Sequence, residues 1–400
     1  KPKIRFKGYT DDWEQRKFGD LVEKYEDPID TPTDGYMRLG IRSHAKGTFH
    51  SYVEKGKELE TAKMFRVAAN NFIVNITFGW EHAVAITDES DAGKLVSHRF
   101  PQYSFENGMI PMFFKYLILD ENFKHHLELS SPGGAGRNRV LKLNDMLEYK
   151  MKFPCEDEQR KLASYFDDLD HLITLHQRKC EETKKLKKYM LQKMFPQNGQ
   201  TVPEIRFAGF TDAWEQRKVN EFLSESREMG HKGDAAQKMT VKLWGKGVYE
   251  KNEVGSANTQ YFTRHAGQFI YSKLDFLNCA FGVVPRELEN FETTADVPAF
   301  DCDGMNPYFM FYTAIQPGFY EKNGMIADGS RKAKRIHVDI FLDMPLLVPK
   351  LEEQNRIVNL LSVLDNLLTL HQRKNIYFLK ILHMFGNSVS FLNLFHFLMV

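Results

Sequence analysis

The sequence predicts an α+β protein built as an internal repeat, with two globular domains that alternate with two long helices. Three observations support this. The 400-residue length exceeds one ordinary hydrophobic core, the same two motifs occur in each half, and each half ends in a long stretch with helical apolar spacing. With 42% hydrophobic and 27% charged residues, the composition is that of a folded globular protein.

The repeat begins each half. PKIRFKGYTDDWEQRK at Pro2–Lys17 recurs as PEIRFAGFTDAWEQRK at Pro203–Lys218, identical at 12 of 16 positions. A second pair ends each half, Glu156–Lys179 matching Leu351–Lys374. Because the frame is duplicated while the sequence inside it differs, the chain is suited to reading two different targets. The alternative is a tandem duplication that drifted without bipartite recognition.

The repeat markers divide the chain into segments. We expect globular domains at residues 1–155 and 197–350, helices at 156–196 and 351–386, and an apolar tail at 387–400. Each domain mixes short β-type runs, such as Asn71–Val74 and Gln268–Tyr271, with helical stretches such as Met112–Leu119.

Heptad spacing predicts the two helices. The first begins after Pro154 and would run from Glu158 to Phe195, about 55 Å, which exceeds the roughly 34 Å of one DNA turn. A helical spacer of this length could hold two readers over separated sites, or it could be simple interdomain packing. His176 and His371 lie in the helix seams as register groups rather than ligands. The seam residues are Leu162, Phe166, Leu169, Ile173, His176, Ile357, Leu361, Leu364, Leu368 and His371.

Two paired basic segments are candidates for contact with nucleic acid. Gly-rich basic loops at 132–139 and 328–335 lie before the two long helices. In these loops glycine permits close approach to a phosphate group, and arginine can form two hydrogen bonds with a phosphate or a guanine edge. A second pair alternates basic residues along a strand or loop, which in a strand would share one face. Both could equally be solvated surface. The candidates are Arg137, Asn138, Arg139, Arg331, Lys332, Lys334 and Arg335 in the Gly-rich loops, and Arg42, His44, Lys46, Lys242, Trp244 and Lys246 in the second pair.

Composition limits the other function classes. The formal net charge of +1 means that any basic surface is local. The four cysteines have no C-x-x-C spacing, so we expect neither a disulfide framework nor a zinc site, and the polar opening run is unlike a signal peptide. Nucleotide-binding and hydrolase motifs are absent from the sequence. We therefore expect a cytoplasmic protein without a catalytic or metal site.

Taken together, the P-x-I-R-F openings, the Glu158-Gln159 and Glu353-Gln354 helix starts and the L-H-Q-R-K helix cores resemble type I restriction-modification specificity subunits. The resemblance implies two target-recognition domains that read a bipartite DNA site across an unread spacer, and an antiparallel coiled coil whose length sets that spacer. It also implies two methyltransferase and two motor-nuclease subunits as partners. S-adenosylmethionine, ATP and Mg²⁺ would belong to those partners, and this chain would bind none.

The chain departs from this pattern at its end, because Ile381–Val400 is apolar and contains no Asp, Glu, Lys or Arg. An altered reading frame or an end covered by a partner is favoured over a membrane span, since polar residues interrupt the segment. A coiled-coil scaffold whose divergent domains bind proteins is the second hypothesis, and a fused nuclease is the third.

Overall fold

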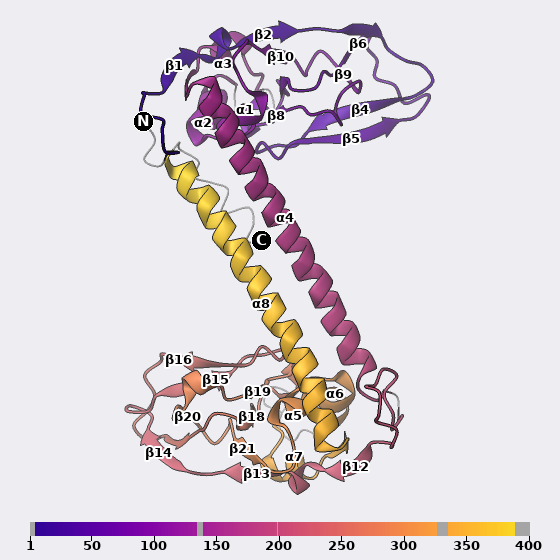
Figure 1. Cartoon of the computed structure of the whole chain (residues 1–400), viewed down its shortest axis with the longest axis vertical. Coiled ribbons are helices and arrows are strands. Elements are labelled where there is room, and N and C mark those ends of the chain that lie inside the picture. The colour runs from indigo at the N-terminus through magenta and orange to yellow at the C-terminus, as the bar shows by residue number, and fades with distance from the viewer. Residues whose placement is uncertain (1–4, 134–138, 198, 326–334, 389–400) are drawn as a thin grey trace. The chain divides into compact units, whose positions relative to one another are not determined.

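The computed structural model describes residues 5–133, 139–197, 199–325 and 335–388. The chain forms two compact units: unit 1 comprises residues 1–177 and 372–400, and unit 2 comprises residues 178–371. Each unit contains one globular domain and a part of both long helices (Figure 1). The boundary between the two units therefore falls within the long helices, whereas the domain boundaries expected from the sequence lie at the ends of these helices. Residues 389–400, which make up most of the apolar tail expected at 387–400, lie outside the described residues.

Unit 1 has three sheets. Their strand orders are β1-β11, β2-β10-β7-β8 and β3-β6-β9-β4-β5, and all neighbours are antiparallel except β4 and β9. The strands are β1 Glu14–Lys17, β2 Val22–Tyr25, β3 Pro28–Asp30, β4 Tyr36–Ile41, β5 Thr48–Val53, β6 Lys63–Arg66, β7 Phe72–Val74, β8 Val84–Ile86, β9 Leu95–Val96, β10 Gln102–Phe105 and β11 Lys150–Phe153. The short helices are η1 Phe18–Asp20, η2 Gly79–Glu81, α1 Pro111–Leu117, α2 Glu121–Leu129 and α3 Leu143–Leu147.

Unit 2 repeats this topology strand for strand. Its sheets have the orders β12-β22, β13-β21-β18-β19 and β14-β17-β20-β15-β16, and again one pair, β15 and β20, is parallel. The strands are β12 Glu215–Lys218, β13 Leu223–Ser226, β14 Met229–Lys232, β15 Lys238–Val241, β16 Val248–Lys251, β17 Gln260–Thr263, β18 Phe269–Tyr271, β19 Phe281–Val283, β20 Glu292–Thr293, β21 Ala299–Cys302 and β22 Pro345–Val348. The short helices are η3 Val219–Glu221, η4 Phe276–Asn278, η5 Arg286–Leu288, α5 Pro307–Ala314, α6 Pro317–Gly324 and α7 Val338–Leu342. Thus the regions that diverge in sequence share one fold.

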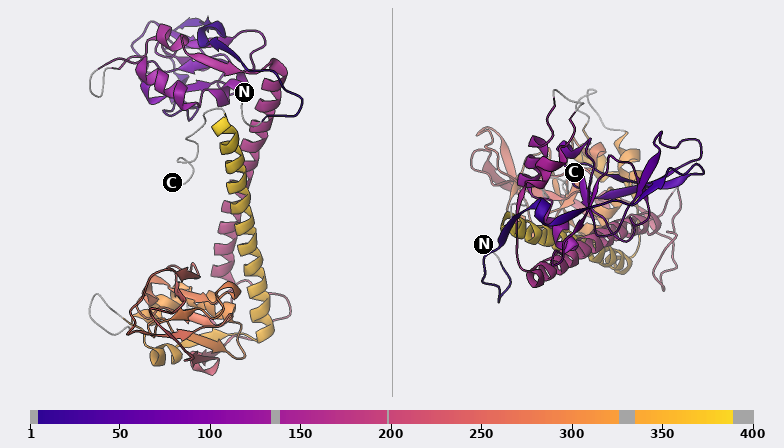
Figure 2. Two further views of the ribbon diagram at one scale, coloured as in Figure 1. Left: turned by 90° about the vertical axis from the view of Figure 1, so that its left-hand side faces the viewer. Right: turned by 90° about the horizontal axis from the view of Figure 1, so that it is seen from above.

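The two long helices are α4 Glu156–Lys193 and α8 Leu351–Ser388. Within unit 1 the first part of α4 packs against the last part of α8, where His176 stacks on Phe378 with ring centroids 5.6 Å apart. Within unit 2 the last part of α4 packs against the first part of α8, and Lys187 forms an ion pair with Asp365 at 2.5 Å. The pairing is antiparallel in both units (Figures 1 and 2), as the sequence resemblance implied.

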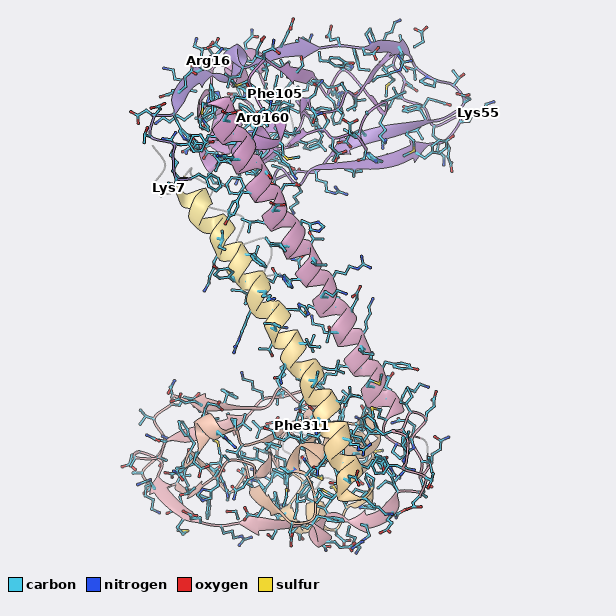
Figure 3. All side chains as sticks on the ribbon, viewed as in Figure 1. Lys7, Arg16, Lys55, Phe105, Arg160 and Phe311 are labelled. Carbon is cyan, nitrogen blue, oxygen red and sulfur yellow. The ribbon has the colours of Figure 1, made fainter. Side chains whose placement is uncertain are left out.

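The predicted seam residues separate into two groups. Most are buried in the helix interface or against the domain cores, namely Leu162, Phe166, Leu169, Ile173, Ile357, Leu361 and Leu364. Leu368, His176 and His371 are half-buried. The helix α4 ends at Lys193 rather than Phe195, and Met194 and Phe195 turn into the core of unit 2, where Phe195 stacks on Phe309 of α5. Phe311 of the same short helix borders this cluster (Figure 3).

The repeated motifs fasten each domain to its helix. Arg5 and Arg206 form paired hydrogen bonds of 2.6–2.8 Å with Glu158 and Glu353, carboxylates that are almost fully buried. The next residue, Gln159 or Gln354, accepts a 3.0 Å hydrogen bond from the backbone ahead of α1 or α5. Removing one member of such a buried ion pair leaves an uncompensated charge. The repeated motifs therefore attach each globular domain to its long helix through the same contacts.

None of the helices in the described ranges is both long and apolar enough to cross a membrane.

Candidate nucleic-acid interface

The second pair of basic segments forms the same tight loop in both units. Residues 42–47 join β4 to β5, and residues 242–247 join β15 to β16. His44 and Ala45, and at the same places Trp244 and Gly245, have positive φ values between 50° and 64°. The sequence left open whether these basic residues lie on a strand or in a loop, and the structure shows a loop. The expectation that their side chains share one face of a strand therefore does not apply.

Each loop rests on a short helical turn through backbone hydrogen bonds. In unit 1 the His44 and Ala45 N–H groups each donate at 2.8 Å to Glu81 and His82 carbonyls at the end of η2. In unit 2 the Trp244 and Gly245 N–H groups donate at 2.8 Å to Asn278 and Cys279 at the end of η4. These bonds fix the loop backbone, so the exposed side chains project from a rigid base.

A cation lies over an aromatic ring at the foot of each loop. The Arg42 guanidinium is 5.3 Å from the centroid of Phe49, and the Lys242 ammonium is 4.9 Å from that of Tyr249. Both rings are more than a third exposed. Sequence reasoning missed Phe49 and Tyr249, although each follows its loop glycine by the same two residues. Exposed basic and aromatic side chains together are suited to phosphate and base contacts.

The Gly-rich loops lie mostly outside the described residues, which excludes Arg137, Asn138, Arg331, Lys332 and Lys334 from structural description. Their last residues are placed. Arg139 lies 5.6 Å from the Trp80 ring of η2 and 3.8 Å from a Glu128 oxygen, and Arg335 lies 3.6 Å from an Asp296 oxygen.

The backbone after each Gly-rich loop returns to the same turn region. The Leu141 N–H donates to Ile76 at 2.9 Å, shortly before η2, and the Ile336 N–H donates to Lys273 at 3.0 Å, shortly before η4. The structure thus brings the end of each Gly-rich loop to the turn that supports the 42–47 or 242–247 loop. In unit 1 the described end of the Gly-rich loop, at Arg139, and the 42–47 loop therefore both lie at the η2 turn.

In unit 1 a pocket of about 670 Å³ opens beside the 42–47 loop. Its lining combines cations, aromatic rings and acids, including Arg38, Phe49, Phe78, Glu81 and Arg99. Glu81 also accepts a 2.6 Å hydrogen bond from the Ser43 hydroxyl in the loop. The surface is therefore of mixed charge, which agrees with the near-zero net charge of the chain.

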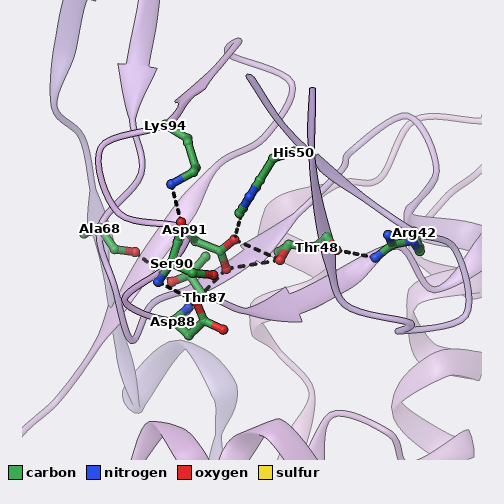
Figure 4. A network of polar contacts seen from close by, with 9 residues as sticks. All are labelled: Arg42, Thr48, His50, Ala68, Thr87, Asp88, Ser90, Asp91 and Lys94. Atoms are coloured by element: carbon green, nitrogen blue, oxygen red, sulfur yellow. Dashed lines mark hydrogen bonds and ion pairs between the residues drawn. The ribbon is translucent and has the colours of Figure 1, made fainter. Parts of the chain in front are cut away.

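A polar network around the buried Asp91 carboxylate supports the same hairpin (Figure 4). The Arg42 side chain donates to the Thr48 carbonyl, and the Thr48 hydroxyl lies 2.9 Å from Asp91, whose carboxylate is almost fully buried. His50, on the edge strand β5, places Nε2 2.7 Å from the same carboxylate. The network links the loop cation to the interior of the domain.

His82 ends η2 in a left-handed conformation and is buried. Its Nε2 lies 2.8 Å from the Ile118 carbonyl oxygen, which can only accept, so Nε2 carries the proton. Burial lowers the pKa of His82 to about 4. The ring is therefore neutral near pH 7, and it serves the turn rather than any reaction. Within the described residues, no three His, Cys, Asp or Glu side chains gather as a metal site would require.

No family model matches the sequence, and no curated protein matches it either. Among solved structures, the type I restriction-modification S subunit from M. genitalium aligns over 97% of this chain and 98% of that chain, with 12% identity and a TM-score of 0.55. The HsdS subunit from Thermoanaerobacter tengcongensis aligns over 94% and 96%, with 14% identity and a TM-score of 0.49. A chain from a structure describing complex assembly and conformational transition of a type I restriction-modification system aligns over 94% and 97%, with 14% identity and a TM-score of 0.47. The alignment with the M. genitalium S subunit shows that this chain shares that fold along nearly its whole length, which confirms the sequence resemblance at the level of the fold.

Proposed function

We propose that the chain is the DNA sequence-specificity subunit of a type I restriction-modification complex, and that each unit reads one half of a bipartite, gapped target. The observation that carries the proposal is the equivalence of the two loops. The same backbone turn presents Arg42, His44 and Lys46 in unit 1 but Lys242, Trp244 and Lys246 in unit 2. Equal scaffolds with different side chains are what two half-sites of different sequence require.

The division of labour within the complex follows from this role. The chain itself has no catalytic part, and two methyltransferase subunits and two motor-nuclease subunits perform the chemistry. S-adenosylmethionine, ATP and Mg²⁺ bind to those partners, while this chain recognises the target sequence in double-stranded DNA.

The helices offer a place for a partner to dock. Val363, Leu367 and Leu370 lie on one face of α8 at helical spacing, and each is 39–53% exposed. An apolar stripe of this kind marks an interaction surface. We expect Leu367→Asp to abolish co-purification with the methyltransferase subunit while leaving DNA affinity unchanged, as measured by pull-down and fluorescence anisotropy. Loss of both would indicate misfolding instead of a lost interface, and retained co-purification would place docking elsewhere.

The decisive experiment maps methylated adenine across a genome that carries the methyltransferase subunit, with and without this chain. We expect one gapped, two-part motif that is present only with the chain. Absence of any motif despite co-purification of the two proteins contradicts the proposal.

The second candidate is a coiled-coil scaffold whose domains bind proteins, which the net charge of +1 favours. DNA affinity at several salt concentrations separates the two functions, because phosphate contacts release counterions and weaken binding steeply as salt rises. A reader of DNA gives a strongly negative slope of log affinity against log salt. A protein scaffold gives no measurable binding.

A further inference from the structure

His50 is an exposed residue held by a buried one. It lies on β5, the edge strand of its sheet, and its side chain is 27% exposed, whereas the Asp91 side chain is only 2% exposed. Asp91 is surrounded by donors: His50 Nε2 at 2.7 Å, the Thr48 hydroxyl at 2.9 Å and the Asp88 N–H at 3.1 Å (Figure 4).

This arrangement fixes the chemistry of the exposed ring. A carboxylate oxygen accepts hydrogen bonds, so the proton of a neutral imidazole sits on Nε2. The other nitrogen, Nδ1, then carries a lone pair and acts as an acceptor. A buried partner that selects the tautomer also holds the ring orientation.

Unit 2 shows that the hairpin does not need this network to stay in place. At the equivalent positions, Val248 stands for Thr48 and Leu288 for Asp91, and these two side chains pack in one apolar cluster. Burying a carboxylate costs free energy that an apolar contact does not. The polar network in unit 1 is therefore explained by what it does to His50. The residue in unit 2 that corresponds to His50 is Glu250, which is also exposed and is an acceptor.

We propose that position 50, and its counterpart 250, are base-reading positions, and that Asp91 is a positioning residue for His50. The inference rests on the proposed DNA-reading function. His50 Nδ1 accepts a hydrogen bond from the exocyclic amino group of an adenine or a cytosine in the major groove, since these are the base-edge donors there. Glu250 accepts from a cytosine in the other half-site.

The test compares variants of the full chain in the methylated-adenine mapping, followed by anisotropy on duplexes that carry each base pair at the affected position. His50→Leu removes the acceptor. Thr48→Val/Asp91→Leu reproduces the apolar support of unit 2 and releases the tautomer. Tyr52→Ala, an exposed change two residues along β5, is the matched control, and Glu250→Ala addresses the other half-site. Thermal unfolding verifies that every variant is folded.

We expect His50→Leu to erase the preference for adenine or cytosine at one position of one half-site, with discrimination falling about tenfold. The Thr48→Val/Asp91→Leu variant weakens discrimination at that same position, Glu250→Ala relaxes the other half-site only, and Tyr52→Ala leaves the motif intact. An unchanged motif in His50→Leu, while the wild-type chain yields a bipartite motif, overturns the inference and leaves the proposed function standing. Full discrimination in a folded Thr48→Val/Asp91→Leu variant overturns the role of Asp91. Absence of a wild-type motif overturns both proposals.

Discussion

At the scale of single residues, His82 connects the fold to pH. Its folded-state pKa of about 4 lies below the usual value of 6.5, so the folded protein keeps the ring neutral where the unfolded chain would protonate it. The associated stability is complete above about pH 6.5 and is lost as the pH falls toward 4. The full effect of this shift is about 3 kcal/mol.

We predict that His82→Asn reduces this loss, because asparagine tolerates the left-handed backbone of position 82 and does not titrate. The measurement is urea unfolding at pH 7 and at pH 5 for both proteins. The wild-type free energy of unfolding should fall more between the two pH values than that of the variant. Equal falls would mean that His82 is not the titrating group.

The sequence identified site residues only where the repeat marked them. Arg42, His44 and Lys46 could be paired with Lys242, Trp244 and Lys246 because the glycines beside them align. Asp91 could not be found in this way. It lies 41 residues from His50, and its counterpart in unit 2 is an apolar residue. Contacts between distant segments leave no local spacing in a sequence.

At the scale of elements, α8 offers a matched pair of aliphatic residues two positions apart. Leu361 is fully buried between α4 and the core of unit 2, whereas Val363 is 53% exposed. We predict that Leu361→Ala lowers the free energy of unfolding by about 3 kcal/mol, through lost burial and a residual cavity. Val363→Ala should change it by less than about 0.5 kcal/mol. Chemical denaturation of the full chain measures the free energy of unfolding of both variants. Equal losses in the two variants would show that burial of Leu361 in the helix interface does not stabilise the fold.

The helices and the frame strands were predictable, because their signals are local. Heptad spacing, the acidic first turn and Pro196 located α4 to within three residues at each end. The identical EQRK segments became the equivalent strands β1 and β12. The fate of Met194 and Phe195 was not predictable from spacing, because their burial depends on Trp214 and Phe309, which belong to later segments.

At the scale of the whole molecule, each divergent region is a closed insert within the repeated frame. The insert of unit 1 runs from Phe18 to Tyr149 and is joined at its ends by a backbone hydrogen bond of 2.7 Å. That of unit 2 runs from Val219 to Met344, joined at 3.1 Å. Both inserts also contact the frame alike, with Tyr116 and Tyr312 donating to Asp170 and Asp365 at 2.9 and 3.0 Å.

We predict that a chain in which residues 18–149 replace residues 219–344 folds and directs methylation to a motif whose two half-sites have the same base sequence. The first junction follows the identical strands β1 and β12, and the second precedes the equivalent strands β11 and β22, so we expect the graft to keep its frame contacts. Genome-wide mapping of methylated adenine reads the result. A second half-site that remained that of the wild-type chain would contradict the assignment of recognition to the inserts.

The common topology of the two inserts was beyond the sequence. Weak echoes such as Lys46-Gly47 and Lys246-Gly247 aligned single turns but not strand order. Strand order arises from pairings such as β4 with β9, which join segments more than 50 residues apart. The two inserts differ strongly in sequence, but they share one backbone topology and differ in the side chains that it carries.

The makeup of unit 1 has a consequence for synthesis. Its core includes Phe378, Leu379 and Ile381 of α8, whereas unit 2 needs nothing beyond His371. A nascent chain therefore holds every residue of unit 2 before it holds the helix that completes unit 1. The domain that leaves the ribosome first is the last to be finished, and a stop codon soon after residue 371 would spare the second domain and leave the first without part of its core.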